Sequence, residues 1–178
     1  MDTKKMVLSA MFAALTVVGG QIALPIGPVP ITFQVLFCFL SGALLGARYG
    51  ALAQLIYVLL GAIGLPVFAG GNGGLGYLAG PTGGYLLGFI VAAFIIGKLT
   101  EAKNYKLVGT AMAMFLGLVL IYLLGTTQLA LVLNMDAKKA IMTGVVPFIV
   151  LDLIRLGLAA VVTVGAKSAL RAANLIMD

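Results

Sequence analysis

Two oppositely charged residues lie close together in one of the most apolar stretches of this 178-residue chain. Asp152 and Arg155 are three positions apart within residues 145–165, and this spacing places both on one face of a helix. Each charge inside a membrane span costs about 2.5–3.5 kcal/mol on insertion scales, and ionisable residues there usually have a function. Two interpretations are open: an ion pair that only neutralises itself, and a ligand site that offers an anion and a cation side by side. We favour the second.

The residue types also indicate what such a site would bind. An ionised Asp152 accepts hydrogen bonds from N–H groups, whereas the guanidinium of Arg155 suits a carboxylate or a phosphate. Asn72, in a glycine-rich segment, can donate and accept, which suits an amide or a urea. Apolar walls suit an aliphatic chain or a ring. These features predict a small amphipathic acid with an amide-like head.

The composition is that of an integral membrane protein. Hydrophobic residues make up 62% of the chain and charged residues only 9%, with a mean hydropathy of +1.20. Soluble domains carry about 25% charged residues. The net charge of +6 comes from basic residues scattered between apolar runs. They form no continuous basic surface, so we expect a lipid membrane around the protein and no nucleic-acid partner.

Catalysis has little support in the sequence. The chain has no histidine, and Asp152 is the only one of its five acidic residues that lies within a predicted span. Neither a pair of catalytic carboxylates nor a Ser/His/Asp site can be assembled from these residues. No Walker lysine follows a glycine-rich loop, and no cluster of metal ligands is present. We therefore expect no enzyme, no cofactor and no metal, and ATP hydrolysis would have to come from partner subunits.

Six apolar runs are candidates for membrane-spanning helices, each of which needs about 20 residues. The runs cover residues 6–24, 31–45, 49–65, 83–99, 107–133 and 145–170. They predict an all-α integral membrane protein with six transmembrane helices and a single domain over residues 1–178. The first run follows two lysines like a signal peptide, but no Ala-x-Ala cleavage pattern follows it. We expect it to be kept as the first helix.

The basic residues predict the orientation of these spans. With six spans, the side that holds both termini carries eight basic residues, and the opposite side carries Lys138 and Lys139. The eight are Lys4, Lys5, Arg48, Lys98, Lys103, Lys106, Lys167 and Arg171. Basic residues prefer the cytoplasmic side, so we expect cytoplasmic termini in the cell membrane. Asp152 and Arg155 then lie near the outer end of the last span, and their site opens outward.

The segment 66–85, predicted on the outer side, is both glycine-rich and apolar. Irregular backbone at membrane depth is tolerated where it is buried in protein or lines a cavity, so we expect this segment to form a lid or pocket wall. Its Gly71, Gly73 and Gly76 match the dinucleotide fingerprint formally. We reject that match because a membrane span precedes it and no acidic residue follows at the required distance.

Small residues at helical spacing predict close helix packing. Gly42, Gly46 and Gly50 are four positions apart, as are Gly84 and Gly88. A further small face on the first span comprises Ser9, Ala10, Ala13, Ala14 and Val17. This face lies toward the predicted cytoplasmic end. Packing within the chain and the docking of a partner are both open for it.

Several motifs together resemble the BioY family, the biotin-binding S components of energy-coupling-factor (ECF) vitamin importers. The similarity lies in residues 27–34, 70–74 and 80–85 and in Pro147-Phe148-x-x-x-Asp152-x-x-Arg155. It implies a six-helix S-component fold that captures biotin from outside. It also implies docking onto a shared transmembrane coupling subunit, which two ATP-binding-cassette ATPases drive. Within that family, the pattern Ala10-x-x-x-Ala14 matches the motif that contacts the coupling subunit.

The resemblance also implies roles for individual residues. Asn72 and Asp152 match positions that hold the ureido ring of biotin. The residue three after the aspartate is usually a lysine that anchors the biotin carboxylate, and here it is Arg155. We expect three further residues to line the pocket, namely Gln34, Tyr77 and Tyr85.

The predicted function is thus high-affinity biotin binding and uptake across the cytoplasmic membrane. An S component for another vitamin, an autonomous secondary carrier for a small amphipathic acid and a purely structural membrane subunit remain open. The carrier has less support, because the two halves show no clear inverted repeat and no second intramembrane acid is present. The structural subunit would have no need of two buried charges.

Overall fold

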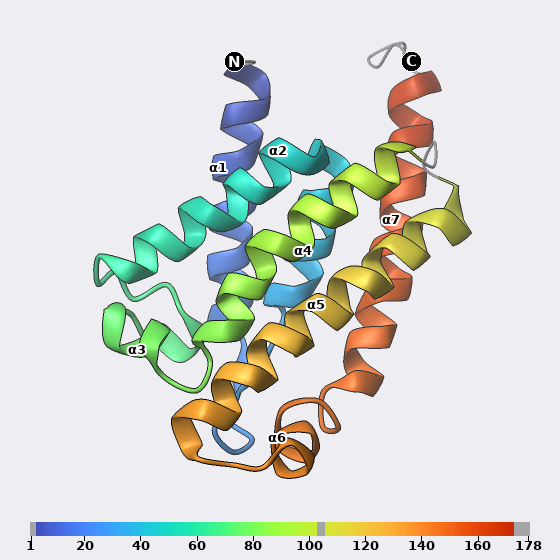
Figure 1. Ribbon diagram of the computed structural model, residues 1–178. Coiled ribbons are helices and arrows are strands. Elements are labelled where there is room, and N and C mark those ends of the chain that lie inside the picture. The colour runs from blue at the N-terminus through green and yellow to red at the C-terminus, as the bar shows by residue number, and fades with distance from the viewer. Residues whose placement is uncertain (1–2, 103–105, 173–178) are drawn as a thin grey trace.

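Long apolar runs fold as long helices, as the sequence predicts. The computed structural model describes residues 3–102 and 106–172, with side chains described up to residue 169. This part of the chain contains seven α-helices (Figure 1). Their bounds are Thr3–Gln21 for α1, Gln34–Ala62 for α2, Leu75–Ala79 for α3, Gly83–Ala102 for α4, Leu107–Leu133 for α5, Ala137–Gly144 for α6 and Ile149–Ala172 for α7. The longest of them pack as one bundle.

A sharp break divides α2 into two arms. Gly46 has φ 82° and ψ 177°, a conformation that is essentially reserved for glycine. The arms fold back on each other so closely that a Cβ on Gly50 would lie 2.6 Å from the Cα of Gly42. The runs predicted as separate spans over residues 31–45 and 49–65 are therefore the two arms of one kinked element.

Within residues 3–102 and 106–172, four helices are long and apolar enough to cross a membrane. They are α2, α4, α5 and the Ile149–Ala169 part of α7. The first helix, α1, is not apolar enough to be included with these four, because Lys4, Lys5 and Gln21 lower its mean hydropathy. The structure thus confirms a helical protein whose long apolar helices are suited to span a membrane. That α1 and each arm of α2 also cross, which would give six spans, stays a prediction.

The two ends of the bundle differ in what they carry. α1 starts and α7 finishes at the upper end in Figure 1, whereas α3 and α6 lie at the lower end. The break in α2, the end of α4 and the start of α5 also lie at the upper end. Five elements therefore bring the basic residues of the predicted inner side together, although Lys103 and the side chain of Arg171 lie outside the described residues. The cytoplasmic location of this end stays a prediction.

The glycine ladders pack helices within the chain, as predicted for helix contacts in lipid. A Cβ on Gly84 would lie 2.3 Å from the carbonyl oxygen of Leu124, and one on Gly88 would lie 2.9 Å from the Cα of Ile121. The backbones of α4 and α5 therefore touch at these positions. This contact fixes where the side chains of the two helices meet near the lower end of the bundle.

The connections contain more regular structure than the sequence indicated. Residues 25–30 join two short antiparallel strands, β1 (Ala23–Leu24) and β2 (Ile31–Thr32), which depart from the predicted all-α chain. Each strand is only two residues long, too short to show an alternating pattern. The glycine-rich segment contains a 3₁₀ turn, η1 (Ala69–Gly71), as well as α3. The connection between the predicted spans 107–133 and 145–170 contains α6. The N-cap residue of this helix, Asp136, accepts a hydrogen bond from the backbone N–H of Lys139.

Candidate functional site

A cavity lies near the lower end of the bundle, where the start of α7 meets α4, α5 and the segment that leads from β2 into α2. Its volume is about 50 Å³. Five of the six residues predicted to contact a ligand line it. These five are Gln34, Tyr77, Tyr85, Asp152 and Arg155. The remaining walls are mainly apolar, so the cavity combines a few polar groups with a hydrophobic lining, as small-molecule sites usually do.

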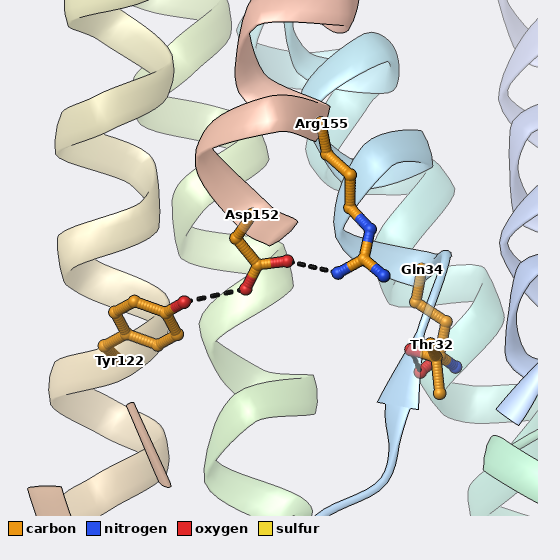
Figure 2. Close-up of polar contacts among 5 residues, drawn as sticks. All are labelled: Thr32, Gln34, Tyr122, Asp152 and Arg155. Atoms are coloured by element: carbon orange, nitrogen blue, oxygen red, sulfur yellow. Dashed lines mark hydrogen bonds and ion pairs between the residues drawn. The ribbon is translucent and has the colours of Figure 1, made fainter. Parts of the chain in front are cut away.

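Asp152 and Arg155 form a buried ion pair on α7. Both residues are buried, with 2% of Asp152 and 7% of Arg155 exposed. Nη1 of Arg155 donates to Oδ1 of Asp152 (Figure 2). Asp152 lies in the first turn of α7, where the helix dipole favours a negative charge. The two side chains thus neutralise each other and line the cavity at the same time, and their use by a ligand stays a prediction.

A third residue completes this charged group. Tyr122 on α5 donates from its phenol hydroxyl to Oδ2 of Asp152, at 2.7 Å (Figure 2). Both carboxylate oxygens are therefore hydrogen-bonded. The guanidinium of Arg155 also stacks over the ring of Phe33, 5.1 Å from its centroid, which supports the cation. Sequence reasoning missed Tyr122, since one tyrosine in an apolar helix has no spacing pattern to distinguish it.

The predicted residue Gln34 belongs to a buried polar chain opposite the ion pair. Its Oε1 accepts from Thr32 Oγ1 at 2.9 Å, and its Nε2 donates to the hydroxyl of Tyr57. Phe68 packs edge-on against Tyr57 and stacks on Tyr77, with centroid distances of 5.6 Å and 5.2 Å. These contacts hold the amide of Gln34 and the ring of Tyr77 in a fixed wall of the cavity.

Tyr85 connects the cavity to α6. Its hydroxyl donates to the backbone oxygen of Gly144 at 2.9 Å. Its ring packs so closely on α5 that a Cβ on Gly125 would lie 2.3 Å from it. Glycine at this position makes room for the ring, and the hydrogen bond fixes its orientation. Tyr85 thus lines the cavity while its hydroxyl is already hydrogen-bonded, and its contact with a ligand stays a prediction.

Asn72 is the predicted ligand residue that does not line this cavity. Its side chain is exposed, and Nδ2 donates to the backbone oxygen of Ala69 at 2.7 Å. It lies in an adjoining groove with Pro30, Ala69 and Tyr77, which line both spaces. The completely buried Phe68 shows that this segment folds back onto the helices, as expected for a pocket wall. The contact of Asn72 with a ligand stays a prediction.

The small face of α1 divides into a packed half and an open half. Ser9 is buried, and its hydroxyl donates to the backbone oxygen of Tyr49 at 3.0 Å. Ala13 is also buried, whereas Ala10 and Ala14 are exposed. Both interpretations of this face therefore have a structural counterpart: Ser9 and Ala13 pack within the chain, and Ala10 and Ala14 form an open strip.

Comparison with known proteins identifies the family. The BioY family model matches residues 1–172. The chain is 49% identical over 168 residues to a protein of Thermotoga maritima named biotin transporter BioY, covering 92% of this chain and 96% of that protein. It is 44% identical over 162 residues to a probable biotin transporter BioY of Pyrococcus horikoshii, covering 91% and 95%.

A solved structure agrees in fold. The crystal structure of the S-component for biotin from an ECF-type ABC transporter superposes with a TM-score of 0.87 at 30% identity. The match covers 94% of this chain and 95% of the other. It confirms the S-component fold that the motifs implied. By sequence and by structure, therefore, this chain belongs to the BioY family.

Proposed function

We propose that this protein binds biotin and acts as the S component of an ECF transporter that imports it across the cytoplasmic membrane. The buried Asp152–Arg155 pair in an otherwise largely apolar cavity carries this proposal. The family membership supports it, because the relatives are named biotin transporters and the solved S-component is one for biotin. A transport role also agrees with the scarcity of catalytic groups in the sequence.

Each end of biotin has a partner in this proposal. The ureido head carries N–H donors, and Asp152 accepts hydrogen bonds from them. The valerate tail ends in a carboxylate, and Arg155 binds it through its planar donors. The rings of Tyr77 and Tyr85 and the amide of Gln34 contact the body of the ligand. Asn72 lies in the adjoining groove and contributes its amide to the recognition of the ureido group.

The open strip on α1 gives the proposed docking site for the transmembrane coupling subunit. Ala10 and Ala14 are exposed although neighbouring small residues of the same helix are packed. Small side chains allow a second helix to approach closely in lipid, where van der Waals contact drives association. Two ATPases bound to that subunit would hydrolyse ATP.

A thermal-shift measurement tests the ligand. Biotin should raise the melting temperature of the purified protein, because a ligand that binds only the folded state adds about 2.7 kcal/mol at 100 times its Kd. Thiamine, riboflavin and folate serve as matched vitamins that should leave the melting temperature unchanged. A shift with one of these three instead of biotin would assign the protein to another vitamin.

A pull-down of the coupling subunit and its ATPases tests the docking strip. Replacing Ala10 and Ala14 together by phenylalanine should abolish recovery of the partner complex, because the bulky rings prevent close helix approach. Biotin binding should stay normal. Leu8→Phe is the control, since Leu8 is 38% exposed on the same helix but outside the strip. Equal recovery with both variants would show that docking occurs elsewhere.

A further inference from the structure

The charged side chains of the cavity touch each other, whereas the proposed function needs them apart. Nη1 of Arg155 and Oδ1 of Asp152 are in direct hydrogen-bond contact. Biotin carries its ureido head and its carboxylate at opposite ends of a carbon chain. A single extended molecule therefore cannot place its head on Asp152 and its carboxylate on Arg155 while these two groups remain in contact. One of the two side chains has to move when the ligand binds.

Arg155 is the side chain that can move. It is long and flexible, and its guanidinium lies between Asp152 and the polar pair of Thr32 and Gln34 in Figure 2. Only one of its nitrogens is bonded to Asp152, and its planar group also rests on the ring of Phe33. Asp152 is short and sits in the first turn of α7, so its position depends on the helix itself.

The departure of Arg155 would leave Asp152 without a cation in a buried place. An uncompensated buried charge is strongly unfavourable, because the remaining group has lost its solvent and its partner. One contact does not depend on Arg155. Tyr122 donates to the other carboxylate oxygen, Oδ2, from a different helix, at 2.7 Å. That bond can persist while Oδ1 exchanges its hydrogen bond from the guanidinium for one from an N–H group of the ligand.

We propose that Tyr122 is a positioning residue of the biotin site, which fixes Asp152 while Arg155 transfers from that carboxylate to the carboxylate of the ligand. This inference rests on the proposed function and adds a residue and a step to it. Tyr122 acts through Asp152, so it supports recognition of the ureido head. Because a charged tail draws Arg155 away from Asp152, Tyr122 matters more for a ligand with a carboxylate than for one with a neutral tail.

Calorimetry with two ligands and a conservative variant tests this role. Tyr122→Phe keeps the ring and removes the hydroxyl, and biotin should then bind roughly 10- to 100-fold more weakly, as expected for a lost hydrogen bond to a charged group. The neutral carboxamide of biotin should lose less, because its tail does not draw Arg155 away from Asp152. The preference for biotin over its carboxamide should therefore fall. Tyr49→Phe is the matched control, since Tyr49 is not among the residues that line the cavity.

A second variant tests the transfer without altering Tyr122. Arg155→Gln removes the cation, so the protein should bind biotin and its carboxamide about equally. A retained preference for biotin in this variant would overturn the transfer. An unchanged biotin affinity in Tyr122→Phe, or an equal loss for both ligands, would overturn the positioning role, because a packing defect affects both alike. No biotin binding by the unaltered protein would refute the proposed function itself, and this inference with it.

Discussion

Asp152→Asn should weaken biotin binding by roughly 10- to 100-fold while leaving the shape of the cavity intact. In the proposed binding mode, the carboxylate of Asp152 is the charged acceptor for the ureido head. A hydrogen bond to a charged group contributes about 1.5–3 kcal/mol, so the loss of the bond between Oδ1 and the ureido head corresponds to roughly 10- to 100-fold in affinity. An asparagine oxygen is a weaker acceptor, and its NH₂ group would face the N–H donors of the ligand. Isothermal titration calorimetry measures the change directly.

Stability has to be separated from affinity in this experiment. Asp152→Asn also leaves Arg155, which is 7% exposed, without its counter-ion, and breaking a buried pair costs about 3–5 kcal/mol. The double variant Asp152→Asn/Arg155→Gln removes both charges and should recover much of the melting temperature without recovering binding. Glu101→Gln is the control for loss of an acid, because Glu101 is exposed at the end of α4. Near-normal affinity in Asp152→Asn would refute the assigned role of the carboxylate.

Gly84→Val should destabilise the fold more than a substitution at an exposed position can. A Cβ on Gly84 would lie 2.3 Å from the carbonyl oxygen of Leu124, and backbone cannot rotate away as a side chain does. The helices α4 and α5 would have to separate, at a cost of roughly 3 kcal/mol or more, the upper end of the range for overpacked cores. Thermal unfolding in detergent should show a lower melting temperature.

The same substitution elsewhere provides the matched control for Gly84. Gly157 on α7 is exposed, and a Cβ there would meet nothing within 4 Å. Gly157→Val should therefore leave the melting temperature nearly unchanged. Gly84→Val should also reduce biotin binding, because Tyr85 and Tyr122 project into the cavity from the two helices that it separates. Equal melting temperatures for the two variants would show that α4 and α5 are not in close contact.

The charged residues of the site were predictable, because ionisable side chains are unusual in an apolar run. Asp152 and Arg155 are conspicuous in an apolar run, and the structure places both at the cavity, in contact with each other. Tyr122 was not predictable, because a tyrosine is common in apolar helices and its partner lies 30 positions away in the sequence. Asn72 was expected in the pocket from the chemistry of its amide and from the motif similarity. In the structure its Nδ2 donates a hydrogen bond to the backbone oxygen of Ala69, within the same loop. Such local hydrogen bonds depend on backbone geometry that the sequence pattern does not reveal.

The fold was predictable where a single physical signal was strong. Hydropathy located the long helices and placed a break between the second and third runs, close to the observed kink at Gly46. It did not predict that both runs form one element, since that depends on the φ and ψ angles of one glycine among 24. The sequence pattern did not reveal α6, although Asp136 is a typical N-cap residue, because eight residues are too few to show a clear helical period.

The mutual neutralisation of Asp152 and Arg155 has an electrical consequence for transport. The two ionised side chains add no net charge to the cavity, so a ligand with one carboxylate gives the loaded protein one additional negative charge. Moving one elementary charge against a membrane potential costs about 2.3 kcal/mol per 100 mV. Inward movement of an anion opposes a potential that is negative inside. The potential therefore opposes the uptake of such a ligand, and in the proposed ECF transporter ATP hydrolysis by the partner subunits would supply the work.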